Sequence, residues 1–204
     1  MPGSFASDAA FRAPDLASPL DVEGLLAAGP PRGLVKGMFF EAVRREVRRA
    51  GAPTPGRDRY TAFRGYPLEE WLVFLPECAS RAFPGLPARE GMRRFGHGAF
   101  RAFQQSTAGR VLFSFAGQDT EAAARLTGRA FDAIASHGRV EVRESGPGHV
   151  VLRLTDMWDY IEGWHVGVYE GATRALGAVP IVEVRMDTPR DGDVRVSWDG
   201  SRAR

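Results

Sequence analysis

The spacing of apolar side chains changes near Gly138. Before this point apolar residues recur every three or four positions, the spacing that lines one face of a helix. After it, Val140 and Val142 alternate with charged residues, and residues 150–154 repeat this alternation. The change predicts a layer of helices followed by antiparallel strands.

Amphipathic helices are predicted throughout the first part. The helical stripes lie in residues 33–50, 67–83 and 87–103, with a bend expected at Pro76. A further helix is expected from Asp119 or Thr120 to about Ser136, because either residue can cap a helix. Residues 111–115 fit a helix or a short strand, and we interpret them as helical. Residues 52–65 hold prolines and glycines and are predicted to form a loop.

Two hairpins separated by one helix are predicted after Gly138. The first pairs the two alternating segments across residues 145–148, and the second joins residues 181–186 to 194–198 through the turn pair Asp191-Gly192. Between them, residues 164–176 return to helical spacing, and Gly177 suits a helix C-cap. The order favours an α+β fold, with N-terminal helices packed on a small antiparallel sheet of about four strands, over alternating βαβ units.

The N-terminal segment differs in composition from the rest. Residues 1–32 are rich in Ala, Pro, Gly and Ser and are predicted to form a poorly ordered arm, in which residues 21–28 make a short helical turn. Residues 33–200 are predicted to form a single α+β domain, since a chain of this length suits one domain.

The charge balance gives little support for a nucleic-acid partner. The formal net charge is only +2, from 27 basic and 25 acidic residues, and Lys36 is the one lysine. The arginines of residues 44–49 share their helix with Glu41 and Glu46, which is typical of a solvated face. We therefore expect no nucleic-acid binding.

Cysteine content and hydropathy point to a cytoplasmic protein. Cys78 is the only cysteine, so no internal disulfide can form, and we expect an inert buried thiol. The chain opens without a charged and then apolar leader. No apolar run approaches the roughly 18 residues of a membrane-spanning helix, so no membrane span is expected.

A series of short motifs carries a family resemblance over most of the chain. The motifs are Lys36-Gly37-Met38-Phe39-Phe40, Tyr66-Pro67 with Trp71, Phe83-Pro84-Gly85, Met92-Arg93-Arg94-Phe95-Gly96, Phe100, Phe103, Thr107-Ala108-Gly109-Arg110, Gly167-Val168-Tyr169-Glu170-Gly171, and Val196 with Trp198. Together they resemble a paralogous family of unknown function that is restricted to the myxobacteria. This family has no established activity to transfer.

The closing helix and hairpin also resemble a wider superfamily, that of four-vinyl-reductase, haem-nitric-oxide-binding and TRAPP-subunit domains. This resemblance implies a helical layer over an antiparallel sheet with an apolar pocket between them, used for small-molecule or acyl-chain sensing and for dimerisation. The sequence lacks the Tyr-x-Ser-x-Arg motif of the haem branch and the zinc-linked cysteines of the reductase branch. We therefore expect no cofactor.

Aromatic residues gather in sequence around one histidine and form the candidate ligand site. The predicted site residues are Trp158, Tyr160, Trp164, His165 and Tyr169. The alternative is an aromatic cluster that only packs the core.

Metal and catalytic sites have weaker support. His97, His137, His149 and His165 lack metal-ligand spacing, so no metal is expected, and His137 and His149 are expected to face solvent. The nearby carboxylates Asp156, Asp159, Glu162 and Glu170 form no recognisable catalytic pair, and no catalytic residue is assigned.

Gly167 and Gly171 lie four residues apart on one predicted helix. Each glycine costs about 1 kcal/mol relative to alanine in a helix interior, so a close contact should offset the loss. We expect tight structural packing, with a pocket wall as the alternative.

These patterns favour a non-enzymatic sensory or adaptor domain in signalling or regulation. It would bind a small apolar ligand or a protein partner. The alternative is a self-associating interaction or scaffold module, such as a homodimer, without a small ligand. A third hypothesis is an enzyme that uses His165 and a nearby carboxylate.

Overall fold

A four-stranded antiparallel sheet lies in the C-terminal half of the computed structural model, which describes residues 10–107, 109–111 and 120–199. Its strand order is β3-β4-β6-β5. The strands are β3 (Arg139–Gly146), β4 (His149–Thr155), β5 (Pro180–Thr188) and β6 (Asp191–Trp198). Val150, Leu152 and Leu154 are buried on one face of β4, as their alternation predicts. Both predicted hairpins are confirmed.

Helices supply the rest of the described structure. They are α1 (Val22–Ala27), α2 (Gly37–Arg49), α3 (Leu68–Ala82), α4 (Ala88–Gln104), α6 (Thr120–Arg125), α7 (Thr127–Asp132), the π-helical turn η1 (Ile161–His165) and α8 (Val166–Ala175). The predicted α+β class is therefore confirmed. Within the described ranges, no helix is both long and apolar enough to cross a membrane.

The start of α2 differs from the prediction. Residues 34–36 form a short strand, β1 (Leu34–Lys36), which pairs with β2 (Gly65–Pro67) in a separate two-stranded sheet. The helix begins only at Gly37, where the N–H groups of Gly37 and Met38 donate to the backbone carbonyls of Arg64 and Ala62. These bonds satisfy donors that a helix start leaves free. The predicted helix start at Gly33 is therefore wrong. The predicted loop over residues 52–65 is wrong at Gly65, which belongs to β2.

Two further predictions need correction. The helix expected up to Ser136 is instead the pair α6 and α7, which meet at Leu126. The pair Asp191-Gly192 begins β6, and the turn lies just before it. Asp119 and residues 112–115 lie outside the described part, so their predicted helical state is not tested.

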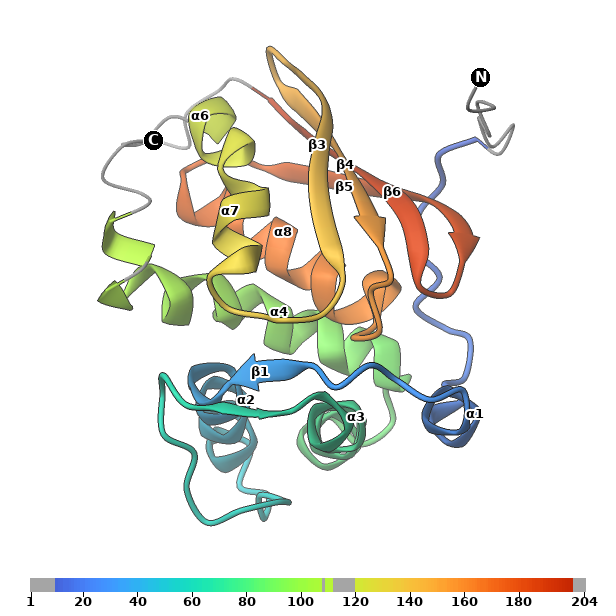
Figure 1. Cartoon of the computed structure of the whole chain (residues 1–204), viewed down its shortest axis with the longest axis vertical. Coiled ribbons are helices and arrows are strands. Elements are labelled where there is room, and N and C mark those ends of the chain that lie inside the picture. Colours follow the sequence, from blue (N-terminus) through green and yellow to red (C-terminus); the bar gives the residue numbers. More distant parts are fainter. Residues whose placement is uncertain (1–9, 108, 112–119, 200–204) are drawn as a thin grey trace.

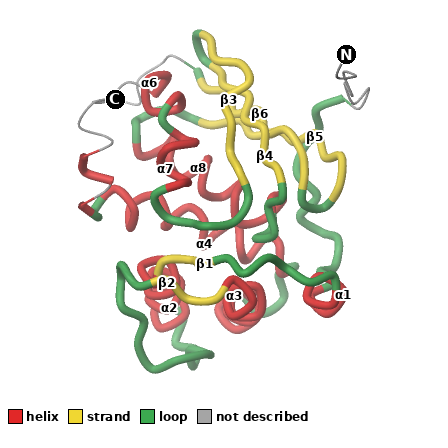
Figure 2. Tube along the Cα trace, in the orientation of Figure 1, coloured by secondary structure: helices red, strands yellow, loops and turns green. Residues whose placement is uncertain are grey.

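Helix α4 lies at the centre of the molecule, with α2 and α3 on one side and the sheet on the other (Figures 1 and 2). On one side, α2 and α3 pack against it around an aromatic group in which Phe40 and Trp71 contact each other and Trp71 contacts Trp164. On the other side, α8 separates α4 from the sheet, whose buried face forms the second cluster with α7. The layers are thus helices α2 and α3, then α4 and α8, then the sheet.

The crossing of α4 and α8 is close enough to exclude side chains. A Cβ atom on Gly167 would lie 2.0 Å from the backbone oxygen of Arg93, and one on Gly171 would lie 2.4 Å from that of His97. Gly96 of α4 is equally close to the backbone of Trp164. Tight helix packing, the structural interpretation of the two glycines on α8, is confirmed.

Residues near the N-terminus contact the sheet. The backbone of Arg12 exchanges two hydrogen bonds with Val184 of β5, with N···O distances of 2.9 and 2.8 Å. The ring of Phe11 lies against the guanidinium groups of Arg185 and Arg195. Glu162 accepts a hydrogen bond from the backbone N–H of Asp15 at 2.9 Å. Part of the predicted arm therefore covers the outer edge of the sheet, while the proposed boundary between arm and domain stays a prediction.

Candidate functional site

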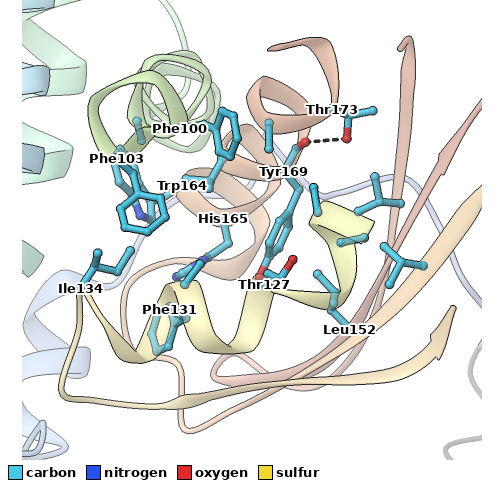
Figure 3. Close-up of a pocket in the computed structure, with 18 of the residues that line it drawn as sticks. Phe100, Phe103, Thr127, Phe131, Ile134, Leu152, Trp164, His165, Tyr169 and Thr173 are labelled. Carbon is cyan, nitrogen blue, oxygen red and sulfur yellow. Dashed lines mark hydrogen bonds between the residues drawn. The ribbon is translucent and has the colours of Figure 1, made fainter. Parts of the chain in front are cut away.

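A cavity of about 120 Å³ lies between the sheet and helices α4, α7 and α8 (Figure 3). Most of its lining is apolar. The ring and aliphatic side chains that line it include Phe39, Phe100, Phe103, Phe131, Ile134, Leu152, Trp164, Val168, Tyr169 and Val196. Well-packed interiors leave few voids larger than a water molecule. For comparison, an apolar cavity of about 150 Å³ binds benzene.

Small residues on the surrounding helices create this space. Ala99 of α4, Ala130 of α7 and Ala172 of α8 line the cavity, where larger side chains would fill it. Alanine favours a helix as strongly as any residue, so these positions leave room without weakening the helices. The cavity is therefore built into the helical layer.

The lining also includes a group of ionisable side chains. Asp159 lies between two histidines: its Oδ1 atom is 2.7 Å from Nε2 of His165 and 3.2 Å from Nε2 of His137. All three residues are buried and line the cavity. The next residue, Tyr160, adopts a left-handed backbone conformation with φ of 63°. This reversal precedes η1 and α8, which carry His165 to the carboxylate six residues earlier.

Asp159 and His137 stabilise each other's charged forms. Burial alone would raise the pKa of Asp159, but the positive charges of His165 and His137 outweigh it and lower the pKa. Burial alone would lower the pKa of His137, but the Asp159 carboxylate outweighs it and raises the pKa. Burial also raises the pKa of Tyr169. The favoured state is an ionised carboxylate beside a protonated histidine.

The hydrogen bonds within the cluster are unequal. The bond between His165 and Asp159 has good geometry at 2.7 Å. By contrast, neither ring nitrogen of His137 has a hydrogen-bond partner in the structure, although His137 lies close to Asp159. A buried polar atom without a partner is uncommon in folded proteins.

The structure brings three of the five predicted site residues together. Trp164, His165 and Tyr169 line the cavity (Figure 3). Trp158 lies elsewhere, with its indole N–H donating to Asp156 at 2.7 Å. Tyr160 donates its hydroxyl proton to a backbone carbonyl of α3. Neither of these two residues reaches the cavity wall.

The predicted environments of the other histidines are partly wrong. His137 does not face solvent as predicted; it is buried, and the segment that carries it pairs with β1 through an isolated bridge between Val35 and Ala135. His97 pairs with Glu170, and His149 pairs with Glu144 on the first hairpin. Across the ranges that the structure describes, no group of three or more His, Cys, Asp or Glu side chains has an arrangement that could hold a metal ion.

Sequence reasoning misses several residues of the site. Helical spacing predicts that Phe103 and Phe131 face the core, but it does not show that they face a common cavity. Asp159 stands out in the sequence only as a possible catalytic carboxylate. The pairing of Asp159 with His137 depends on a contact between the two ends of the first hairpin, which no local pattern reveals.

Solved H-NOX structures share this fold. A variant H-NOX protein from S. oneidensis in the Fe(II) ligation state is 15% identical, with a TM-score of 0.60, over 81% of this chain and 97% of that chain. An S. oneidensis H-NOX protein in the Fe(II)NO ligation state is 14% identical, with a TM-score of 0.58, over 81% of this chain and 99% of that chain. An Fe(II) unliganded H-NOX protein from K. algicida is 11% identical, with a TM-score of 0.56, over 81% of this chain and 97% of that chain.

At such low identities the likeness shows the fold alone. No curated protein sequence gives a significant match. A family model, however, matches residues 30–199, which is most of the chain. The chain therefore belongs to the family described as "Protein of unknown function (DUF2378)".

Proposed function

We propose that this protein is a non-enzymatic sensory or adaptor domain that binds a small apolar ligand in the cavity beside Trp164. The cavity itself carries the proposal, because it is lined mainly by apolar side chains and is close in size to one that binds benzene. The fold neighbours add support at a coarse level, since they include an Fe(II) unliganded protein and one in the Fe(II)NO ligation state.

Haem does not fit the described residues. The Nε2 atoms of His137 and His165 both lie beside Asp159, so the carboxylate already occupies the position where iron would bind either atom. No arginine or lysine belongs to the described lining of the cavity to pair with the propionates of a haem. A porphyrin is also several times larger than benzene. The ligand we propose is therefore smaller and binds without iron.

Binding of a neutral apolar probe tests the proposal. Benzene should stabilise the protein against heat, because a ligand that binds only the folded state raises its stability, by about 2.7 kcal/mol when its concentration is a hundred times the Kd. Isothermal titration should give a negative heat-capacity change, the mark of buried apolar surface.

A matched pair of variants, one on α7 and one at its C-cap, provides the control. Ala130→Phe should fill the cavity and abolish benzene binding, whereas Ala133→Phe places the same ring at an exposed position and should leave binding unchanged. Equal binding by the two variants, or none by the wild-type protein, would refute the proposed site. If benzene binds as expected, native mass spectrometry of the purified protein would identify a natural ligand.

The other hypotheses predict different results. A self-associating scaffold would form a stable oligomer without a co-purifying compound, which size-exclusion chromatography with light scattering would detect. An enzyme of the third class would use His165 with Asp159, and His165→Ala would abolish its activity. Binding of benzene without turnover favours the sensory domain.

A further inference from the structure

Residues 11–15, here called the strap, connect the edge of the sheet to the π-helical turn η1. The backbone of Arg12 exchanges two hydrogen bonds with Val184 of β5, and its guanidinium group lies 2.9 Å from the carboxylate of Glu162 in η1. The same carboxylate accepts the backbone N–H of Asp15 at 2.9 Å. Figure 1 shows this part of the chain passing beside the sheet on its way to α1.

The turn η1 forms part of the cavity wall and has an uncommon backbone conformation. Trp164 and His165 of this turn line the cavity (Figure 3). Tyr160, just before it, has a φ of 63°, and the hydrogen bond from the N–H of His165 to the carbonyl of Tyr160 is long, at 3.4 Å. A left-handed residue other than glycine persists only where surrounding contacts hold it. The shape of this wall therefore depends on the contacts of η1 with its neighbours.

Glu162 makes the contacts that hold the outer side of η1. Its side chain is 11% exposed, and its carboxylate pairs with Arg12 and with Arg89 of α4, the latter at 3.4 Å. With the N–H of Asp15, two of these three partners belong to the strap. Release of the strap would leave a mostly buried carboxylate with Arg89 alone, which is an unfavourable arrangement. We expect η1 to become less ordered as a result.

The strap itself is held by contacts near the surface. None of residues 10–20 is buried, and the side chain of Arg12 is 49% exposed. The ring of Phe11 lies between two guanidinium groups, 4.8 Å from that of Arg185 and 4.4 Å from that of Arg195. Segments with few buried contacts open at low free energy while the rest of a protein stays folded. The strap can therefore dock and release without unfolding of the domain.

We propose that the strap is a conformational switch coupled to the cavity. Docking of the strap holds η1 in the conformation that forms the cavity wall, so a bound ligand favours the docked strap and release of the strap weakens ligand binding. The inference rests on the proposed function, since it names how the same site is regulated. Release would also uncover the backbone N–H and C=O groups of Val184, which makes the edge of β5 the place where ligand binding is read out.

Hydrogen exchange of the wild-type protein tests the coupling without a variant. The N–H of Val184 donates to the strap, so it exchanges when the strap opens. Saturating benzene should slow this exchange about fivefold, the lower end of typical couplings between two sites. The N–H of Gly51, which bonds to Arg48 at the end of α2, is the control and should exchange at the same rate with and without benzene.

The coupling must also act in the opposite direction, because the free energy that links two binding events is reciprocal. Arg12→Pro removes both the N–H that bonds to Val184 and the guanidinium group that pairs with Glu162. It should raise the Kd for benzene, measured by isothermal titration, by the same factor of about five. Arg45→Ala, which removes an exposed arginine from α2, is the control and should leave the Kd unchanged.

The outcomes separate this inference from the proposed function. Unchanged exchange of the Val184 N–H in saturating benzene, or equal Kd values for Arg12→Pro and the wild-type protein, overturns the switch and leaves the ligand site in place. If benzene does not bind the wild-type protein, the proposed function fails and the switch fails with it.

Discussion

Replacing Gly167 with alanine tests how closely α4 and α8 approach each other. The added methyl carbon would lie 2.0 Å from the backbone oxygen of Arg93 and 2.7 Å from its carbonyl carbon. The contacted atoms belong to the helix backbone, which cannot change rotamer to avoid the contact as a flexible side chain can. To reach an ordinary contact distance of roughly 3.5 Å, the two helices must separate by more than about 1 Å.

The expected loss of stability follows from two opposing effects. Overpacking a well-packed interior costs about 1–3 kcal/mol. Alanine regains about 1 kcal/mol of helix propensity over glycine. Separation of the helices also strains the paired hydrogen bonds from Arg93 to Glu170, both 2.8 Å long. We expect a net loss of about 2 kcal/mol and a fall in Tm of about 4–8 °C for a chain of this size.

Urea unfolding followed by circular dichroism would measure this loss. Gly98 provides the control, because it lies on α4 but a methyl group added to it would meet no atom within 4 Å. Gly98→Ala should stabilise the protein by up to about 1 kcal/mol. If Gly167→Ala proved as stable as Gly98→Ala, the close crossing of the two helices would be refuted.

Three further results are expected. Asp159→Asn should lower the free energy of unfolding by about 3 kcal/mol in urea titrations, because it leaves a buried histidine charge unpaired; a loss near zero would contradict the buried ion pair. The raised pKa of His137 stabilises the folded state fully below its ordinary pKa of about 6.5, and this contribution is lost as the pH rises through the folded-state pKa. Wild-type stability should therefore fall as the pH rises above about 6.5, and the fall should be smaller in Asp159→Asn; equal slopes of stability against pH in the two proteins would argue against the pairing. Burial raises the pKa of Cys78 to about 12, so a thiol reagent at about pH 8 should modify it only as the protein unfolds, and rapid labelling of the folded protein would contradict its burial.

Side-chain periodicity is sufficient to predict most of the elements. The stripe through Met92, Phe95, Ala99 and Phe103 lies on the buried face of α4, because one surface of that helix contacts the core throughout its length. The alternation in β4 also marks its core face, where Val150, Leu152 and Leu154 are buried, although Val151 on the opposite face is buried as well. The resemblance to a family of unknown function is confirmed, whereas its restriction to myxobacteria stays a prediction.

Short elements and long-range contacts escape the same reasoning. Strand β1 has three residues, too few for an alternating pattern, and the apolar side chain of Val35 also fits the helical stripe that follows. The cavity results from alanines on three different helices, and each is an ordinary residue within its own helix. His137 meets Asp159 because β3 and β4 pair, so their contact is visible only in the folded chain.

The backbone hydrogen bonds between Arg12 and Val184 affect which truncated forms of the protein should stay monomeric. Strand β5 lies at the end of the sheet, where unpaired N–H and C=O groups can recruit a strand from another molecule. Residues 11 and 12 precede the segment that the family model matches, so a fragment trimmed to residues 30–199 would lack this cover. Exposed Val179 and Ile181 would then border an open strand, and such a fragment should aggregate more readily than the full chain.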